Sequence, residues 1–157
     1  MTITDSGLID TLKTGNYTVL DRAVPQTAEE KRAFWGKVAT CDYYFMSSNA
    51  ITMNGELLNI DGMGNRVASL IWGPEHVIII AGMNKVVDNI ETAYHRARQI
   101  AAPMNTQRLE RTTPCTQTGR CMDCLHPECI CSQFVVTRRN MMEGRIKIIL
   151  VGEELGY

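Results

Sequence analysis

The chain has 157 residues, of which 45% are hydrophobic and 21% are charged, and its formal net charge is −1. These values are typical of one soluble domain with its own core and argue against disordered and membrane-embedded classes. The balanced charge offers no general attraction to nucleic acid or anionic lipid, so we expect neither as a partner. The N-terminus lacks the basic and apolar regions of a signal peptide, and we therefore expect a cytoplasmic protein.

The first forty residues alternate between helical and extended patterns. Asp5 or Ser6 is placed to cap a short helix that Gly15 ends, and residues 17–20 have the pattern of a short strand. A capping box at residues 27–30 begins a second helix, which we expect to cover one face of a sheet.

The middle of the chain predicts a strand followed by a β-hairpin. Residues 43–48 are strand-like, and Asn54-Gly55 lies between two apolar runs, 51–53 and 57–60. This dipeptide is the strongest short hairpin signal, so we expect the two runs to pair.

The rest of the chain continues the alternation of helices and strands. The expected elements are a helix from Asn65 to Gly73, a strand over 77–81, a helix that begins at the capping pattern of residues 88–91 and ends before Pro103, and strands over 134–137 and 146–151. The run at 77–81 is continuously apolar, as in a strand buried on both faces of a parallel sheet. The pattern as a whole predicts a single α/β domain over residues 1–157.

Polar and glycine residues gather at the ends of these strand patterns, where open α/β sheets bind ligands. Gly62 and Gly64 can present backbone N–H groups at a helix start, and Arg66 can add a bidentate contact to a carboxylate or phosphate. Asp61 would repel an anion if ionised. We therefore expect it to bind a ligand hydroxyl or a cation, or to transfer a catalytic proton, and it is the best catalytic candidate. The predicted ligand-binding residues are Asn49, Asp61, Gly62, Gly64, Asn65, Arg66, Gly82, Asn84 and Lys85.

The same residues have a structural interpretation. The Asp-Gly-x-Gly-Asn segment can be only a tight turn, with Asp61 capping the next helix and Arg66 exposed to solvent. Lys85 can likewise be a solvated lysine at the start of a helix.

Five of the six cysteines lie between Cys115 and Cys131, in a cysteine-rich loop over residues 112–132 that precedes the last strands. The Cys121-x-x-Cys124 spacing lets two thiolates reach one metal from a single turn, and cysteines on either side can complete a tetrahedral set. Zinc and an iron-sulfur cluster both suit all-cysteine ligation. The alternative is a loop of reduced thiols or an adventitious disulfide.

Several motifs together resemble the LUD family, the lactate-utilisation domain. They are Ser47-x-Asn-Ala-Ile-Thr, the segment from Asn54 to Ala68, Ile80-Ala-Gly-Met-Asn-Lys-Val-Val, and Pro114-Cys-x5-Cys-x2-Cys-x6-Cys. The resemblance implies a Rossmann-like, mostly parallel sheet with flanking helices, similar to the sugar-phosphate isomerase and CoA-transferase group. It also implies a metal set of Cys115, Cys121, Cys124 and Cys131, with Cys129 as a possible substitute, and iron-sulfur redox partners.

These observations give two hypotheses. The first is a lactate- or organic-acid-utilisation protein that binds a small anionic metabolite and works with iron-sulfur proteins. The second is a metal- or iron-sulfur-bearing assembly or electron-transfer module without its own catalytic site. Members of the family are expected to carry a further N-terminal segment with an early strand. An exposed sheet edge in its place would favour a homodimer.

Overall fold

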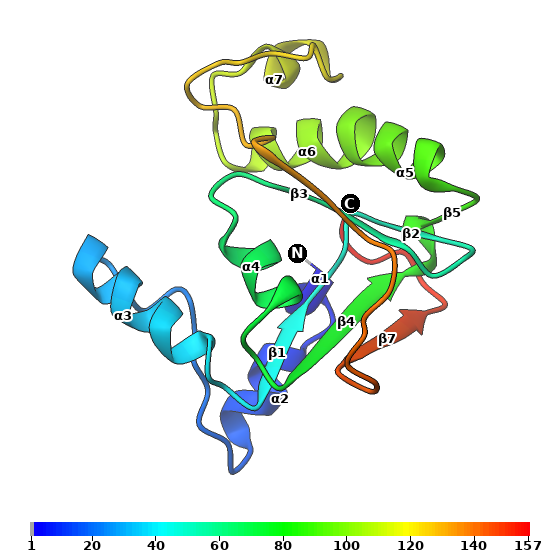
Figure 1. Ribbon diagram of the computed structural model, residues 1–157. Coiled ribbons are helices and arrows are strands. Elements are labelled where there is room, and N and C mark those ends of the chain that lie inside the picture. Colours follow the sequence, from blue (N-terminus) through cyan, green and yellow to red (C-terminus); the bar gives the residue numbers. More distant parts are fainter. Residues whose placement is uncertain (1) are drawn as a thin grey trace.

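A computed structural model describes residues 2–157 and has an α/β architecture (Figure 1). A three-stranded parallel sheet runs in the order β1 (Tyr43–Met46), β4 (His76–Gly82) and β7 (Ile146–Val151). The central strand β4 is buried from Val77 to Gly82, which confirms the expected parallel sheet and its buried strand. Helices flank this sheet, so the predicted α/β class with a Rossmann-like arrangement is confirmed.

A second, four-stranded sheet is mainly antiparallel. Its order is β5 (Val86–Val87), β2 (Ala50–Thr52), β3 (Leu57–Asp61) and β6 (Gln133–Thr137). Strands β2 and β3 form the predicted hairpin, with Ala50 opposite Leu58. Gly55 has a φ of 82° at the turn, a left-handed conformation that glycine adopts without strain.

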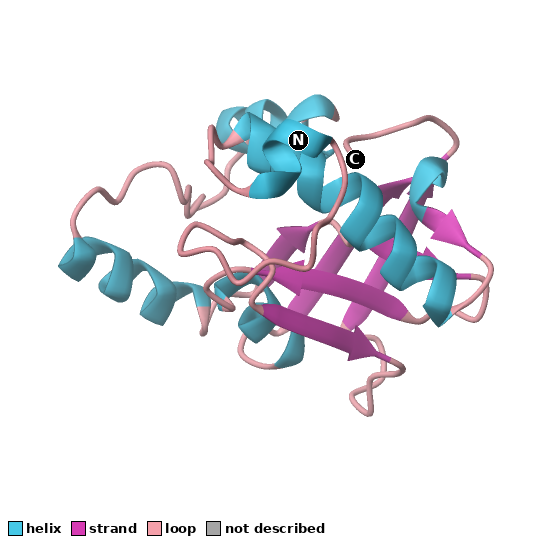
Figure 2. Ribbon diagram, turned by 90° about the horizontal axis from the view of Figure 1, so that it is seen from above, coloured by secondary structure: helices cyan, strands magenta, loops and turns pink. Residues whose placement is uncertain are grey.

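Helices flank the two sheets, and α3 (Ala28–Val38) stands apart from them (Figure 1 and Figure 2). The helices are α1 (Thr2–Asp5), α2 (Leu8–Thr14), α3, α4 (Asn65–Ile71), the 3₁₀ turn η1 (Met83–Lys85), α5 (Ile90–Arg96), the π-helical turn η2 (Ala97–Ala101), α6 (Ala102–Arg108) and α7 (Pro114–Thr118). One core lies between the sheets and includes Ile51, Leu70 and Ile79. A second lies between β2, β3 and the helix α5–η2 and includes Leu58 and Ala93.

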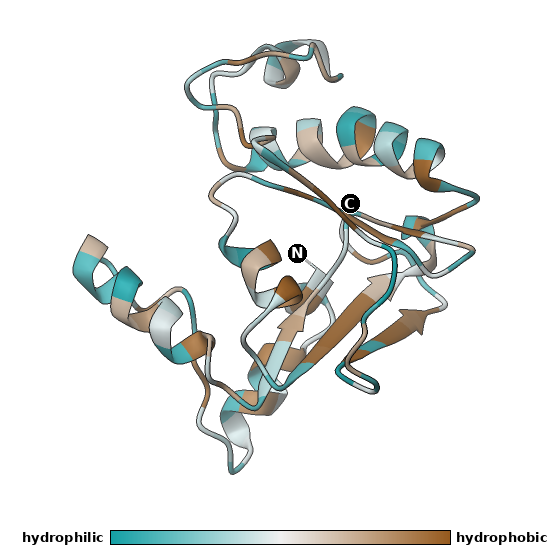
Figure 3. Cartoon of the chain, viewed as in Figure 1, coloured by the Kyte–Doolittle hydropathy of each residue, from teal (hydrophilic) through white to brown (hydrophobic). Residues whose placement is uncertain are grey.

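Strand β7 forms one edge of the parallel sheet. Figure 3 shows that its ribbon is largely apolar. Ile148, Ile149 and Leu150 nevertheless remain 38%, 49% and 49% exposed. An exposed apolar edge of this kind is compatible with the homodimer expected from the sequence, which stays a prediction.

The N-terminal elements correct two expectations. Gly7, with a φ of 70°, is the N-cap of α2 and follows the extra turn α1, so neither Asp5 nor Ser6 caps that helix. Residues 17–20 form no strand. The Tyr17 ring packs back over Gly15, and no strand among the described residues pairs with this segment, so its backbone lacks the hydrogen-bond ladder of a strand.

Helix α3 begins with the predicted capping box but does not cover a sheet. The Thr27 side chain accepts from the Glu30 N–H, as expected. Among the α3 residues only Val38 is buried, and the rings of Phe34 and Trp35 pack edge to face against each other at 5.2 Å. The apolar residues are thus too few and too close together in sequence to form a stripe that docks on the sheet.

The helix after β5 is longer than predicted and starts one residue later. Asn89, rather than Asp88, is its N-cap, and its side chain accepts from the Thr92 N–H. The helix passes through Pro103 and ends at Arg108, and the π turn η2 ends two residues before the proline. A widened turn relieves the clash and the lost hydrogen bond that proline causes in a regular helix. Within residues 2–157, no helix has the length and apolarity needed to cross a membrane.

Candidate functional site

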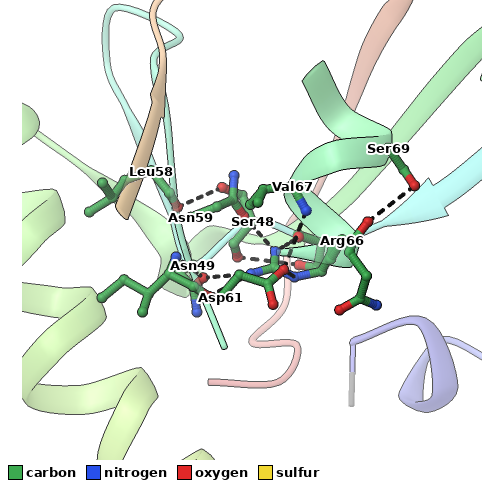
Figure 4. Close-up of polar contacts among 11 residues, drawn as sticks. Ser48, Asn49, Leu58, Asn59, Asp61, Arg66, Val67 and Ser69 are labelled. Carbon is green, nitrogen blue, oxygen red and sulfur yellow. Dashed lines mark hydrogen bonds and ion pairs between the residues drawn. The ribbon is translucent and has the colours of Figure 1, made fainter. Parts of the chain in front are cut away.

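Arg66 on α4 lies at the centre of a hydrogen-bond network between the two sheets (Figure 4). Its Nη1 donates to the Ser47 carbonyl at 3.0 Å and to Asn59 Oδ1 at 2.6 Å. Its Nη2 donates to Asn49 Oδ1 at 3.1 Å and to the Ile60 carbonyl at 2.8 Å. The guanidinium therefore joins the segment after β1 to strand β3, and these contacts occupy both of its terminal nitrogens.

The Asp61 carboxylate belongs to the same hydrogen-bond network as Arg66. Its Oδ2 accepts from the Val67 N–H at 3.3 Å in the first turn of α4 and lies 3.6 Å from Arg66 Nε. Burial lowers the pKa of Arg66, and the Asp61 carboxylate opposes this shift. A carboxylate at a helix start beside a buried arginine stabilises both, so these contacts favour the capping interpretation of Asp61.

The glycine turn that follows Asp61 packs against the cysteine-rich loop. A Cβ on Gly62 would lie 3.5 Å from the Ile130 carbonyl oxygen, and the Ser132 N–H donates to the Asp61 carbonyl at 3.1 Å. Gly64 is the N-cap of α4 with a φ of 81°, and Asn65 opens the helix. The two regions singled out in the sequence are therefore neighbours in space.

Lys85 is buried at the carboxyl ends of the parallel strands. Its side chain follows β4, is 3% exposed, and donates from Nζ to Thr2 Oγ1 at 2.7 Å and to Ser47 Oγ at 3.1 Å. Ser47 directly follows β1, so the lysine lies where two parallel strands end together, which is the usual ligand edge of such a sheet. The solvated lysine expected as an alternative is wrong.

The charge of Lys85 is poorly compensated. Within residues 2–157 no salt bridge reaches its Nζ. Burial, first of all, and then the cations of Arg96 and Arg66 lower the pKa of Lys85 from 10.5 to about 8, against a weaker opposite effect of Asp5. A buried ammonium among like charges is costly unless an anion joins it.

The two ends of the chain cover this lysine. Asn84 donates from Nδ2 to the Gly156 carbonyl at 3.0 Å and accepts from the Leu155 N–H at 3.3 Å. The Thr2 hydroxyl donates to the Leu155 carbonyl at 3.1 Å. At Gly82, a Cβ would lie only 2.4 Å from the Leu155 nitrogen. Gly82 and Asn84 thus contact the C-terminal tail, which lies with α1 over Lys85.

Sequence reasoning missed four residues of this region: Thr2, Ser47, Asn59 and Arg96. Arg96 is 6% exposed and donates from Nη1 to the Asn49 carbonyl at 2.6 Å and from Nε to the Asn84 carbonyl at 2.8 Å. Asn59 is fully buried, and its Nδ2 has no hydrogen-bond partner among the described residues. Arg96 was detectable as a cation between the apolar positions Ala93 and Ala97 of one helix, whereas the others carried no local signal.

The five clustered cysteines surround a single cavity of about 120 Å³ between the helix η2–α6 and the cysteine-rich loop. It is lined by Cys115, Cys121, Cys124, Cys129 and Cys131, together with Arg98 and Phe134 among others. Burial and the neighbouring thiols of Cys129, Cys121 and Cys115 raise the pKa of Cys131 to about 12. Within residues 2–157, no three His, Cys, Asp or Glu side chains are arranged to hold one metal ion as they stand.

The cysteine sulfurs differ in their contacts. The Cys121 sulfur accepts from Arg98 Nη2 and from the Asp123 N–H, both at 3.4 Å. The Cys129 sulfur accepts from the Cys131 N–H at 3.4 Å. Arg98 also forms an ion pair with Asp123, and the Cys121 sulfur raises the pKa of Arg98.

Comparison with known proteins gives one informative match. No curated protein and no solved structure matches the chain. A family model described as the LUD domain matches residues 1–151 of the 157, which include the polar network, Lys85 and the cysteine-rich loop. The chain therefore belongs to the LUD domain family.

Proposed function

We propose that this protein binds a small anionic metabolite at the carboxyl ends of β1 and β4, with Lys85 as the cation that recognises it. Membership in the LUD family implies a place in lactate or organic-acid utilisation and nothing finer. To this role the proposal adds the ligand site at Lys85. It also adds iron-sulfur redox partners, and these partners are supported only by the resemblance of the sequence to the family. The observation that carries the site is the buried ammonium of Lys85, which has hydroxyl partners and no carboxylate partner among the described residues.

The neighbouring groups support an anion at this place. Among the described residues the buried Asn59 Nδ2 donor has no acceptor. Arg66 Nη1 donates both to Asn59 and to the carbonyl of Ser47, the residue whose hydroxyl contacts Lys85. A carboxylate or phosphate would supply the acceptor and the negative charge that these groups lack. Ligand entry requires Thr2 and the C-terminal tail to move away from Lys85.

The residues of the site then divide into two groups. Lys85, Ser47 and Asn59 offer donors to a ligand. Arg66, with the carboxylate of Asp61, holds the surrounding segments in place, because its terminal nitrogens already donate to internal acceptors. We therefore assign the anion contact to Lys85 in place of Arg66, and we assign Asp61 to the framework in place of proton transfer.

Thermal-shift screening tests this proposal. Lactate and other 2-hydroxy acids, phosphosugars and nucleotides are tested against the wild-type protein, the Lys85→Met variant and the Lys31→Met variant. Lys31 lies on the exposed helix α3 and is a matched control for the loss of one positive charge. We expect at least one anion to stabilise the wild type and Lys31→Met but not Lys85→Met. An equal shift in Lys85→Met would contradict the site.

A second function has its own supporting observation. All five clustered cysteines line one cavity, which favours a metal- or iron-sulfur-bearing assembly or electron-transfer module without its own catalytic site. Protein purified without oxygen is analysed for iron and zinc and for charge-transfer absorbance. The module hypothesis fails if the protein contains neither metal in stoichiometric amount and shows no such absorbance.

A further inference from the structure

We propose that the ligand of the Lys85 site is a doubly charged anion, a small phosphate monoester, in preference to a singly charged carboxylate. Arg96 supplies the second positive charge that this ligand meets. The inference rests on the anion site proposed above and narrows its ligand to one class.

Three buried cations surround one short piece of backbone that follows β1. Lys85 Nζ donates to the Ser47 hydroxyl at 3.1 Å, and Arg66 Nη1 donates to the Ser47 carbonyl at 3.0 Å. Arg66 Nη2 donates to Asn49 Oδ1 at 3.1 Å, and Arg96 Nη1 donates to the Asn49 carbonyl at 2.6 Å. Ser47 and Asn49 are two residues apart in the chain, so the three positive charges are concentrated in one small region.

Arg96 is linked to Lys85 by a second contact. Its Nε donates at 2.8 Å to the carbonyl of Asn84, the residue directly before Lys85. Arg96 is 6% exposed, and its hydrogen bonds among the described residues leave from Nε and Nη1. Its Nη2 therefore keeps its donors for a ligand.

Carboxylates do not balance these three cations. Among the described residues, Asp61 is the only carboxylate that forms an ion pair with any of them, at 3.6 Å from Arg66 Nε. No salt bridge among these residues reaches Lys85 or Arg96. Carbonyl and hydroxyl partners satisfy hydrogen bonds without supplying an opposite charge, so two positive charges remain uncompensated. A ligand with two negative charges restores the balance, and a lone carboxylate restores half of it.

A phosphoryl group suits this arrangement because it carries both charges on one compact group. At neutral pH a phosphate monoester has a charge of roughly −1.5 to −2 and three acceptor oxygens. A dicarboxylate divides its charges between two ends, whereas the cations here surround one segment. The donors available for the oxygens are Lys85 Nζ, Arg96 Nη2 and the unpartnered Nδ2 of Asn59. Arg66 contributes its charge alone, since internal acceptors occupy its terminal nitrogens.

The two ends of the chain occupy the space that the phosphoryl group needs. A Cβ on Gly156 would lie 2.6 Å from Thr2 Oγ1 and 3.4 Å from Lys85 Nζ, so the Gly156 backbone and the Thr2 hydroxyl lie directly beside the ammonium. The movement of Thr2 and the tail that ligand entry requires frees this space. A dianion then replaces two uncharged groups next to Lys85.

Two esters of the same shape and different charge test the inference. Methyl phosphate is mainly a dianion at pH 7.5, whereas methyl sulfate is a monoanion. Calorimetric titration measures the dissociation constants of both esters for the wild type, Lys85→Met, Arg96→Gln, Arg96→Lys and Arg32→Gln. Arg32 lies exposed on α3 and is a matched control for the loss of one guanidinium. Circular dichroism checks that each variant is folded.

We expect the wild type and Arg32→Gln to bind methyl phosphate at least about tenfold more tightly than methyl sulfate, because the second negative charge meets a second buried cation. Arg96→Lys should keep this preference, and folded Arg96→Gln should lose most of it. Lys85→Met should bind neither ester. The comparison in the wild type needs no variant, so it tests the charge of the ligand even where Arg96→Gln does not fold.

The outcomes separate this inference from the anion site on which it rests. Equal binding of the two esters by the wild type, or binding of neither while another anion in the thermal-shift screen binds at Lys85, would overturn the choice of a phosphate monoester and leave the site standing. Full preference in folded Arg96→Gln would overturn the role of Arg96. Methyl phosphate binding that persists in Lys85→Met would overturn both the inference and the site.

Discussion

Replacing Lys85 with methionine should make the protein more stable at neutral pH while abolishing anion binding. Methionine has a similar length and flexibility and removes the charge from a site that is 3% exposed. The lost hydrogen bonds to Thr2 and Ser47 work against this gain, but the Thr2 hydroxyl keeps its bond to the Leu155 carbonyl.

The lowered pKa of Lys85 gives the magnitude. The shift from 10.5 to about 8 is 10.5 − 8 = 2.5 pKa units. At about 1.4 kcal/mol per unit, the folded state carries a cost of about 3 kcal/mol for the charged amine. Below pH 8 the amine is charged in both the folded and the unfolded chain, so the cost is present in full. Between pH 8 and 10.5 the folded protein releases its proton while the unfolded chain keeps it, so the cost disappears as the pH rises.

Urea unfolding of the wild type, Lys85→Met and Lys31→Met at pH 7 and pH 10 measures this difference. We expect Lys85→Met to exceed the wild type by up to about 3 kcal/mol at pH 7 and by much less at pH 10. Lys31→Met should stay within about 0.5 kcal/mol of the wild type, since Lys31 is exposed. A Lys85→Met variant that is clearly less stable at pH 7, or whose difference does not change with pH, would refute the idea that Lys85 is an uncompensated buried charge.

Three further predictions concern the same framework and the cysteine cavity. Arg66→Ala should lower the free energy of unfolding by roughly 3 kcal/mol or more, because it leaves Asp61 and several buried acceptors without their partner, and denaturant unfolding measures this loss. Binding of an anion at Lys85 should weaken by up to tenfold per pH unit above pH 8, as calorimetric titration at several pH values would reveal; a flat profile would argue against Lys85 as the anion contact. Arg98→Gln should weaken metal binding about tenfold or, for a cluster, lower its reduction potential, since it removes the cation beside Cys121, and a competition assay or voltammetry would detect either effect.

Elements with a strong local signal were predictable from the sequence. The Asn54-Gly55 hairpin, the capping box at Thr27 and the buried strand β4 all depend on residues that are close together in the chain. The predictions for two helices were wrong because the contacts that decide their packing and length are not visible in the local sequence. Helix α3 has the right cap but no surface to dock on, and the helix that should end before Pro103 continues because a π turn accommodates the ring.

The sequence predicted which residues belong to the candidate site, but it did not predict the contacts that these residues make. The sequence singled out both Arg66 and Lys85 but treated Arg66 as the free cation. Internal acceptors occupy the terminal nitrogens of Arg66, whereas Lys85 is buried and donates to two hydroxyls. One of the contacts that cover Lys85 joins Thr2 to Leu155, and no local pattern links the two ends of the chain.

The pKa of Lys85 is the most direct test of the proposed anion site. Lysine side chains labelled with ¹³C at Cε are titrated by NMR, with Lys85→Met assigning the resonance, in the presence and absence of L-lactate, glycolate or inorganic phosphate. We predict one lysine that titrates near pH 8 without an anion and at a clearly higher pH when one of these anions is bound. A Lys85 resonance that titrates near 10.5, or that none of the three anions shifts, would contradict the proposed site.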